Sequence, residues 1–455
     1  MIKRMLIANR GEIAVRIIRT CKLMKIETVA VYSTADKEAL HVQLADYAVC
    51  IGKGSAKDSY LHMQNILSAA CMTGCDAIHP GFGFLSENAQ FARLVMQCGL
   101  LFVGPSPDVI DRMGDKNHAR QSMIEAGVPV IPGSKDILHT VDDAYRQADV
   151  IGYPVLIKAA SGGGGRGMRR VNTKDELKAA YESAKAEAKA CFHHDAVYME
   201  KLLLQPKHIE VQLAADQHGN VIHLFERDCS AQRRNQKVLE EAPCHSLSQT
   251  TRQRLLHDAK KACFAVGYDS VGTIEFLFDG QENYYFMEMN TRIQVEHTIT
   301  EEITGIDLIR LQIQIAQGHT LPYTQEQIQL HGYAMECRIN AEDIRKDFAP
   351  CAGKISFINF PLGQHVRIES AVYNGYTIPP FYDSMIAKII VSGPTRLECI
   401  RRMRIALEEL LIEGIETNIE LQYLLLYHPT FISGRYDTGF METFIKELKE
   451  DGTII

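Results

Sequence analysis

The segment 288–296 carries a polar side chain at every second position, namely Glu288, Asn290, Arg292, Gln294 and Glu296. In an extended chain alternate residues point to the same side, so these side chains would form one polar surface. Carboxylate and amide oxygens suit a hard cation such as Mg²⁺, and the arginine that follows them suits a small oxyanion. A solvated edge strand could show the same alternation, and this alternative stays open.

A predicted hairpin places a further carboxylate beside this segment. The stretches 273–278 and 285–290 flank an Asp-Gly pair at 279–280, which is typical of a tight turn between two strands. Glu275 on the first strand could then face Glu288 on the second. The two carboxylates together favour a magnesium site.

The glycine run 162–167 indicates a loop that folds over phosphate groups. It follows a predicted strand at 154–158 and precedes another at 168–171. A dinucleotide-binding glycine motif would open a helix instead, which disfavours a nicotinamide enzyme. Glycine backbone can approach phosphates closely and donate N–H bonds, and the nearby Lys158 could reach the same anion. A flexible surface hairpin is the alternative.

Two further charged groups are candidates for anion binding. The stretch 226–237 concentrates charge beyond a strand, which favours a cationic pocket floor with Lys237 facing an anion; a solvated loop is the alternative. Arg338 lies on a strand-like segment, where a structural salt bridge is the alternative. The stretch 208–213 alternates polar and apolar residues and predicts a half-buried strand.

The elements that must position these residues begin with a parallel sheet. Short apolar runs at 5–8, 28–32 and 101–103 alternate with helical patterns, which predicts a doubly wound α/β sheet. The turns 9–11 and 79–83 fall at the carboxyl ends of strands, where such sheets bind their ligands.

The pattern changes after about residue 113. We expect a helix at 116–126 and a capping box at 173–176 that opens another helix. After about residue 330, shorter strands and a helix predict a third, α+β domain. These elements are strands at 367–369 and 385–391 and a helix at 395–413.

The overall composition excludes several classes of protein. The chain has 455 residues and a net charge of −7, so about two to four domains are expected and a nucleic-acid partner is not. No stretch approaches the roughly 20 apolar residues that span a membrane, and no signal peptide is expected. The 12 cysteines are scattered singly and form no zinc pattern, which predicts reduced thiols in a cytoplasmic protein.

Several of these motifs, taken in order, resemble one known family. The chain is similar to the biotin carboxylase subunits of acetyl-CoA carboxylases, within the ATP-grasp superfamily. The resemblance covers nearly the whole chain, from residue 8 to residue 418. The motifs that carry it are 79–88, 113–116, 158–168, 226–243 and 288–297.

The resemblance implies a multidomain α/β and α+β architecture. A Rossmann-like N-terminal domain would occupy 1–113, and a C-terminal α+β domain would occupy 331–446. Between them, an ATP-grasp region at 114–330 would carry a mobile lid at about 131–202.

The resemblance also implies the roles of individual residues. The ATP site would comprise Lys116, Lys158, Gly163, Gly164, Gly165, Arg166, Gly167, Met168, Glu200, Lys201, Leu203, His208, Gln232, Asn235, Glu275 and Glu288. Bicarbonate would bind to Lys237, Arg292, Gln294, Val295 and Glu296, and biotin to Arg338, Phe82 and Gly83. Two Mg²⁺ or Mn²⁺ ions would be held by Glu275, Glu288 and Asn290. The catalytic residues would be Lys237, Arg292, Glu296 as the base, and Arg338 facing the ureido oxygen of biotin.

The function implied by the resemblance is ATP-dependent carboxylation, by bicarbonate, of biotin on a biotin carboxyl carrier protein. The reaction would pass through carboxyphosphate and begin the synthesis of malonyl-CoA for fatty acids. The chain has no Met-Lys-Met biotinylation motif, so the carrier and the carboxyltransferase subunits are expected to be separate chains. A homodimer is also implied, with Arg16 and Arg19 as candidate interface residues or, alternatively, an exposed polar face. Alternative functions are a subunit of another acyl-CoA or 2-oxo acid carboxylase, or another ATP-grasp ligase that forms an acyl phosphate.

Three residues depart from the family pattern. Phe82 stands where tyrosine is usual, and Asn235 where histidine is usual, so contacts near biotin or the nucleotide are expected to differ. Thr298 replaces a common proline, which should change the rigidity of a turn more than the chemistry.

Overall fold

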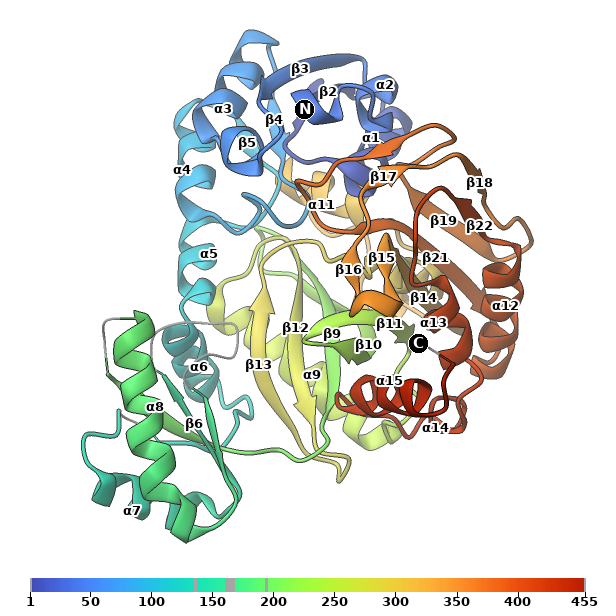
Figure 1. Ribbon diagram of the computed structural model, residues 1–455. Helices are drawn as coiled ribbons and strands as arrows, with labels where there is room; N and C mark the ends of the chain where they lie inside the picture. The colour runs from blue at the N-terminus through green and yellow to red at the C-terminus, as the bar shows by residue number, and fades with distance from the viewer. Residues whose placement is uncertain (1, 135–136, 160–167, 193–194, 454–455) are drawn as a thin grey trace.

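The computed structural model describes residues 2–134, 137–159, 168–192 and 195–453. A parallel sheet lies at one end of the molecule, a small unit protrudes near the other end, and a long sheet lies between them and the C-terminal helices (Figure 1). Within these ranges no helix is long and apolar enough to cross a membrane. The cysteines whose side chains the structure describes are free.

Five parallel strands form the N-terminal sheet, which confirms the predicted doubly wound arrangement. In spatial order they are β3 (Tyr47–Gly52), β2 (Glu27–Ser33), β1 (Arg4–Ile7), β4 (Ala77–His79) and β5 (Leu101–Phe102). The helices of this region are α1 (Gly11–Leu23), α2 (Leu40–Leu44), α3 (Met63–Met72), α4 (Ala89–Gln97) and α5 (Pro107–Gly114).

The two turns expected at the carboxyl edge of this sheet are joined by Asn9. Its Nδ2 donates to the carbonyl oxygens of Pro80 and Phe82, each at 2.7 Å. The neighbouring Gly11 has φ +66°, a left-handed conformation that glycine adopts without a steric penalty. The second turn is therefore held against the start of α1.

Arg16 does not lie on an exposed polar face of α1. It is buried, and its Nη2 donates to Glu301 and Asp307 of the same chain, each at 2.9 Å. Arg19 is half-exposed, and its Nη1 lies 3.3 Å from Glu369. The polar side of this helix is thus largely covered by the chain's own acidic residues, because a buried guanidinium needs such partners.

The protruding unit is a three-stranded antiparallel sheet covered by two helices, with its own apolar core (Figure 1). Its elements are β7 (Arg169–Val171), β6 (Val155–Ala159), β8 (Val197–Lys201), α7 (Val141–Ile151) and α8 (Leu177–Phe192). The capping box expected at 173–176 is not formed among the described residues. Thr173 makes no capping bond, and Glu176 accepts from the backbone of Asn172 instead, because the first turn is a 3-10 helix.

The long sheet has eight strands and continues from the central region into the C-terminal region. Their spatial order is β13 (Tyr284–Asn290), β12 (Val271–Phe278), β9 (Lys207–Ala215), β10 (Val221–Arg233), β11 (Gln236–Ala242), β14 (Tyr333–Asn340), β21 (Met385–Gly393) and β19 (Val366–Ser370). The expected third domain therefore shares a sheet with the region before it, since β11 pairs with β14.

Two expectations about this sheet were wrong. Every residue of β9 is buried, although the alternation at 208–213 predicted a half-buried strand. The reason is that β9 lies between β10 and β12 and its polar side chains face a buried charge cluster. The charged stretch 226–237 was expected beyond a strand, but most of it lies within β10 and β11, which also excludes the alternative of a solvated loop.

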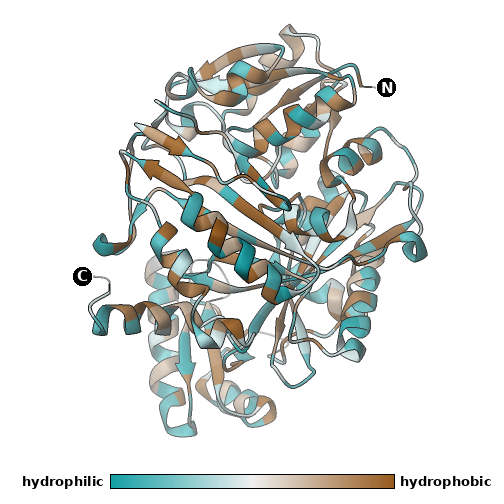
Figure 2. Ribbon diagram, turned by 90° about the vertical axis from the view of Figure 1, so that its right-hand side faces the viewer, coloured by the Kyte–Doolittle hydropathy of each residue, from teal (hydrophilic) through white to brown (hydrophobic). Residues whose placement is uncertain are grey.

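Helices cover the long sheet and close the C-terminal region. Figure 2 shows apolar residues along the central strands and polar residues on the outer faces of the helices. The predicted helix at 395–413 ends earlier, at Glu409, and residues 411–413 form a strand that pairs with β18 (Phe357–Asn359). The helices are α6 (Lys116–Glu125), α9 (Gln249–Val266), α10 (His297–Thr304), α11 (Leu308–Ala316), α12 (Arg396–Glu409), α13 (Ile419–Leu425), α14 (Pro429–Ile432) and α15 (Phe440–Glu450). The short strands are β15 (Glu342–Asp343), β16 (Ala349–Pro350), β17 (Gly353–Lys354), β20 (Thr377–Ile378) and β22 (Leu411–Glu413).

Candidate active site

A cavity of about 890 Å³ opens between the small unit, the N-terminal region and one face of the long sheet. It brings together most of the residues that were expected to bind substrates. These are Phe82, Lys116, Lys158, Met168, Glu200, His208, Gln232, Asn235, Lys237, Glu275, Glu288, Asn290, Arg292, Gln294, Val295, Glu296 and Arg338.

Lys237 on β11 is the central cation of this cavity. Its Nζ lies 2.6 Å from Glu210, 3.0 Å from Glu275 and 2.5 Å from Glu296. Burial alone would lower the pKa of this ammonium, but the three carboxylates raise its pKa well above the usual value. Lys237 is therefore held in its charged form, with carboxylates that an incoming anion would have to displace.

Glu296 is held between two cations at the start of α10. Its Oε1 accepts from Lys237, and its Oε2 accepts from Nη2 of Arg338 at 2.9 Å. Burial would raise the pKa of this carboxyl, but Lys237 and Arg338, with Arg227 behind them, hold the pKa well below its usual range. Glu296 is thus ionised and able to accept a proton.

Arg338 on β14 is also bound to Glu240 of the adjacent strand β11. Its Nε donates to Oε1 of Glu240 at 2.6 Å. Burial would lower the pKa of the guanidinium, and the neighbouring Glu240 and Glu296 raise it above its usual value. Arg338 therefore presents a permanent positive charge to the cavity.

The hairpin of β12 and β13 has the predicted register. Glu275 and Glu288 are paired directly across the two strands. Burial and the charge of Glu275 raise the pKa of Glu288, as expected for two carboxylates that face each other. The Nδ2 of Asn290 donates to Glu275 at 2.8 Å. Two carboxylates and an amide are donors that fit a hard divalent cation, which would relieve this repulsion.

Two lysines reach the cavity from other elements. Lys116 is the first residue of α6, and Lys158 lies on β6, where its ammonium pairs with Glu200 of the neighbouring strand β8. The glycine loop residues Gly163, Gly164, Gly165, Arg166 and Gly167 lie outside the described residues. The strand that carries Lys158 ends at Ala159, three positions before the glycine run in the sequence.

Three predicted residues do not line the cavity. Lys201 follows Glu200 on β8, so its side chain points to the opposite face, and its Nζ donates to the carbonyls of Gly152 and Tyr153 at 2.8 and 2.9 Å. Leu203 and Gly83 are also absent from the described lining. Their assignment to nucleotide and biotin stays a prediction.

Arg227 is a buried organiser of the site that motif reasoning missed. The guanidinium is fully buried and donates to five side chains: Glu210 at 2.5 Å, Gln212 at 2.7 Å, Gln294 at 2.7 Å, Thr300 at 2.9 Å and Thr273 at 3.2 Å. It thereby holds both a partner of Lys237 and the amide of Gln294. The sequence did offer one signal for Arg227: it lies between Glu226 and Asp228, in a stretch that belongs to a strand.

Glu87 is a second missed partner. Its Oε2 accepts from Nε of Arg292 at 2.8 Å, and its Oε1 accepts from the backbone of Thr291 at 3.1 Å. Arg292 also donates to Oδ1 of Asn290 at 2.9 Å. The arginine expected to bind an oxyanion is thus neutralised by Glu87, which follows the second turn of the N-terminal region.

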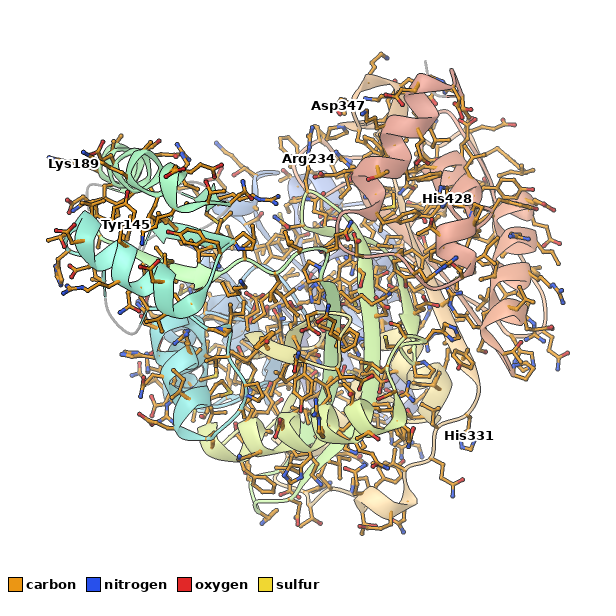
Figure 3. The ribbon with its side chains drawn as sticks, turned by 90° about the horizontal axis from the view of Figure 1, so that it is seen from below. Tyr145, Lys189, Arg234, His331, Asp347 and His428 are labelled. Carbon is orange, nitrogen blue, oxygen red and sulfur yellow. The ribbon has the colours of Figure 1, made fainter. Side chains whose placement is uncertain are left out.

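The three departures from the family pattern have distinct environments. Phe82 lines the cavity without a hydroxyl, and Asn235 occupies the β10–β11 turn with φ +63°. Its neighbour Arg234 is exposed and forms an ion pair with Asp347, with Nη2 2.9 Å from the carboxylate (Figure 3). The hydroxyl of Thr298 donates to Glu336, so this residue adds a polar contact that proline lacks.

Family models match three consecutive parts of the chain. Residues 1–110 match the biotin carboxylase N-terminal domain, and residues 336–443 match the biotin carboxylase C-terminal domain. Residues 115–324 match the ATP-binding domain of the carbamoyl-phosphate synthase L chain.

Known proteins are similar over nearly the full length. Biotin carboxylase 1 of Bacillus subtilis is 54% identical over 445 residues, which cover 98% of this chain and 99% of the relative. The crystal structure of a biotin carboxylase–beta-gamma-ATP complex from Campylobacter jejuni has a TM-score of 0.91 at 48% identity, covering 97% of this chain and 99% of that one. The biotin carboxylase domain of Hydrogenobacter thermophilus 2-oxoglutarate carboxylase, solved with ADP, magnesium and bicarbonate, has a TM-score of 0.90 at 48% identity, covering 97% and 98%.

These similarities extend over the parallel sheet, the small unit and the long sheet that together enclose the cavity. The chain belongs to the biotin carboxylase family of ATP-grasp enzymes and is an ATP-dependent biotin carboxylase.

Proposed function

We propose that the chain catalyses the first half-reaction of an acetyl-CoA carboxylase, in which bicarbonate and ATP carboxylate the biotin of a separate carrier protein. The observation that supports this proposal is the joint approach of Lys237 and Arg338 to Glu296, inside the cavity that also contains Lys116 and Lys158. One cavity thus offers a base, an anion site and phosphate-binding lysines.

Bicarbonate would bind to Lys237, Arg292, Gln294 and the Val295 backbone, close to Glu296. The low pKa of Glu296 makes it a weak base while Lys237 donates to it. A bicarbonate that takes over the Lys237 contact adds a negative charge and removes a stabilising bond, and both changes raise the pKa of Glu296. Glu296 would therefore become a better base when its substrate is in place.

The phosphates of ATP would be held by Lys116, Lys158 and the glycine loop, and Lys158 would exchange Glu200 for a phosphate oxygen. His208, Gln232 and Asn235 would line the rest of the nucleotide site. A divalent cation, Mg²⁺ or Mn²⁺, held by Glu275 and Glu288 with Asn290, would neutralise charge on the transferred phosphoryl group. Attack of the bicarbonate oxygen on the γ-phosphorus would give carboxyphosphate and ADP.

Carboxyphosphate would then split at its C–O bond into CO₂ and phosphate. The released phosphate would accept the ureido proton of biotin, and the ureido nitrogen would attack CO₂. Arg338 would face the ureido oxygen of biotin, beside Phe82, and stabilise the negative charge that develops when the ureido nitrogen loses its proton. The small unit would move as a lid, because carboxyphosphate would hydrolyse in open water. Its separate apolar core supports this role.

The proposed partners are a biotin carboxyl carrier protein, carboxyltransferase subunits and a second copy of this chain. The acceptor proposed is acetyl-CoA. Because the similar 2-oxoglutarate carboxylase domain is about as close in sequence as the other solved relative, a 2-oxo acid is the second candidate. Carboxylation assays with the purified partner subunits would compare acetyl-CoA with 2-oxo acids directly.

The half-reaction is tested by ATP cleavage in buffer stripped of inorganic carbon, with bicarbonate and free biotin then added back. We expect cleavage to depend on bicarbonate and to rise with biotin, and labelled carbon to appear in carboxybiotin. Cleavage that is unchanged without bicarbonate, with no labelled biotin, would refute the proposal.

A further inference from the structure

Lys388 is a fully buried lysine directly behind the cavity. It lies on β21, where it is paired with Arg338 of β14 across the two strands. Residues paired in this way project from the same face of a sheet. The Nζ of Lys388 donates to the carbonyl oxygen of Val295 at 2.6 Å, and Arg338 donates to the carboxylate of the next residue, Glu296. Two cations on one sheet face therefore hold two consecutive residues.

The contact with Val295 constrains the geometry of Glu296. The carbonyl of Val295 and the amide nitrogen of Glu296 belong to the same planar peptide group. Fixing that oxygen therefore fixes the plane from which Glu296 enters α10. A neutral side chain could also donate a hydrogen bond to the Val295 carbonyl. A buried ammonium such as that of Lys388 destabilises the fold unless nearby carboxylates balance its charge.

The compensating charges come from several elements. Glu12 of α1 has an oxygen 3.3 Å from Nζ, and neither of its carboxyl oxygens has a hydrogen-bond partner within the described part of the chain. Burial would lower the pKa of Lys388, but Glu12, with Glu336 of β14 and Glu369 of β19, raises it against the opposing charge of Arg367. Lys388 is therefore held charged.

We propose that Lys388 is a positioning residue for the carboxylation reaction, and that Glu12 is its counter-ion from the N-terminal region. The ammonium holds the peptide between Val295 and Glu296 so that the Glu296 carboxylate meets Lys237 and Arg338 together. This inference rests on the proposed role of Glu296. It links the first helix of the chain to the placement of the base, although α1 contributes no residue that contacts Glu296 among those described.

The test separates positioning from stability with a single and a double variant. Lys388→Met removes the donor and the cation beside Glu12. Burial raises the pKa of Glu12 to about 7 although Lys388 lowers it, so without Lys388 this carboxyl must take up a proton or remain an unpaired buried charge. Either outcome should lower the melting temperature. The double variant Lys388→Met/Glu12→Gln removes both charges and should recover most of that loss, because replacing a whole buried pair is better tolerated than breaking it. Arg396→Met is the matched control, since it breaks another buried pair, between Arg396 of α12 and Glu241 of β11.

Each variant is assayed below its melting temperature for bicarbonate-dependent ATP cleavage, the KM for bicarbonate and ADP affinity. We expect both Lys388 variants to lose cleavage by about 10- to 100-fold, as displacements of about 1 Å typically do, while ADP affinity stays unchanged. Arg396→Met should lower the melting temperature without changing the KM for bicarbonate. Glu12→Gln alone should cause a smaller loss, because the donor to Val295 remains.

If the double variant recovers ATP cleavage as well as stability, the proposal is overturned. Lys388 would then have only a structural role. If Lys388→Met does not fold, the double variant alone tests the proposal, because it also lacks the Lys388 donor to Val295. Failure of the proposed function is distinguishable, because the unchanged protein would then show no bicarbonate-dependent cleavage at all.

Discussion

The ammonium of Lys237 lies 2.5 Å from Oε1 of Glu296 and also contacts Glu210 and Glu275. The single positive charge of Lys237 is thus shared among three carboxylates. Arg338 contacts the other carboxylate oxygen of Glu296. In the proposed reaction, these carboxylates would occupy the donors of Lys237 until bicarbonate displaces them.

Glu296→Ala should abolish bicarbonate-dependent ATP cleavage. A positioned general base contributes about 10²- to 10⁴-fold to a rate, so a loss of that size is expected. Nucleotide affinity should persist, because Lys116 and Lys158 are untouched. Phosphate release with and without bicarbonate measures the first effect, and ADP titration measures the second. Near-normal bicarbonate-dependent cleavage in this variant would show that Glu296 is not the base.

Arg338→Ala should reduce biotin carboxylation more than it reduces ATP cleavage without biotin. The lost charge acts on the ureido oxygen in the proposed reaction, and removing one such donor typically costs about 3 kcal/mol in the transition state. Arg338→Lys keeps the charge but loses the two-pronged geometry, so it should recover part of the rate. Label incorporated into biotin is compared with phosphate release; equal losses in the two assays would contradict this assignment.

Arg227→Met should destabilise the protein by about 3–5 kcal/mol, because it leaves the buried Glu210 without its guanidinium partner. Urea unfolding measures the loss. Arg227→Met combined with Glu210→Gln removes both charges and should unfold at a higher urea concentration than the single variant. If the single variant unfolds like the unchanged protein, the buried ion pair contributes little to stability.

Thr298→Val should lower stability by about 1–3 kcal/mol. Valine keeps the shape of threonine but leaves the buried Glu336 without its hydroxyl donor. Thr298→Ser retains the hydroxyl and is the matched control. The difference between the two variants in urea unfolding isolates the hydrogen bond, and equal midpoints would indicate that Glu336 finds another donor.

Stability should fall as the pH drops below about 6.5. Burial, with a smaller effect from the charge of Arg16, lowers the pKa of His79 to about 3, so the folded state binds a proton less readily than the unfolded chain. The stabilising effect is complete above the unfolded pKa and is lost as the pH falls towards the folded value. At pH 5 the loss is about 2 kcal/mol, since one pKa unit corresponds to about 1.4 kcal/mol.

His79→Asn tests this pH dependence. The Nδ1 of His79 accepts from the backbone of Gly81 at 3.0 Å, and an asparagine oxygen can replace that acceptor. Urea midpoints at pH 7.5 and 5.0 should therefore differ less in the variant than in the unchanged protein. Equal differences in both proteins would assign the acid loss to other groups, such as the buried His41.

Local patterns predicted several features correctly. The hairpin in which Glu275 faces Glu288 was predicted correctly, but its strands are joined by residues 279–283 and not by a two-residue turn. A shift of register between Glu275 and Phe276, which the sequence did not indicate, brings the two carboxylates opposite each other. The alternation of apolar runs and helical patterns predicted the doubly wound N-terminal sheet. The resemblance to biotin carboxylases also identified most of the residues that line the cavity.

Other features depended on contacts between distant segments. The carboxylate partners of Lys237 and Arg338 come from β9, β11, β12 and the start of α10. Glu87 approaches Arg292 from the N-terminal region. The burial of β9 and the continuation of its sheet through β14 follow from strand pairing across more than one predicted domain. No single stretch of sequence contains this information.

The sequence by itself determined which chemical groups are present and how neighbouring residues alternate, because backbone geometry repeats over a few residues. Only the tertiary structure decided which buried charges meet, and therefore which acid is held ionised beside Lys237. The physical reason is that the pKa of a buried carboxyl depends on charges within a few ångströms in space, wherever they lie in the sequence.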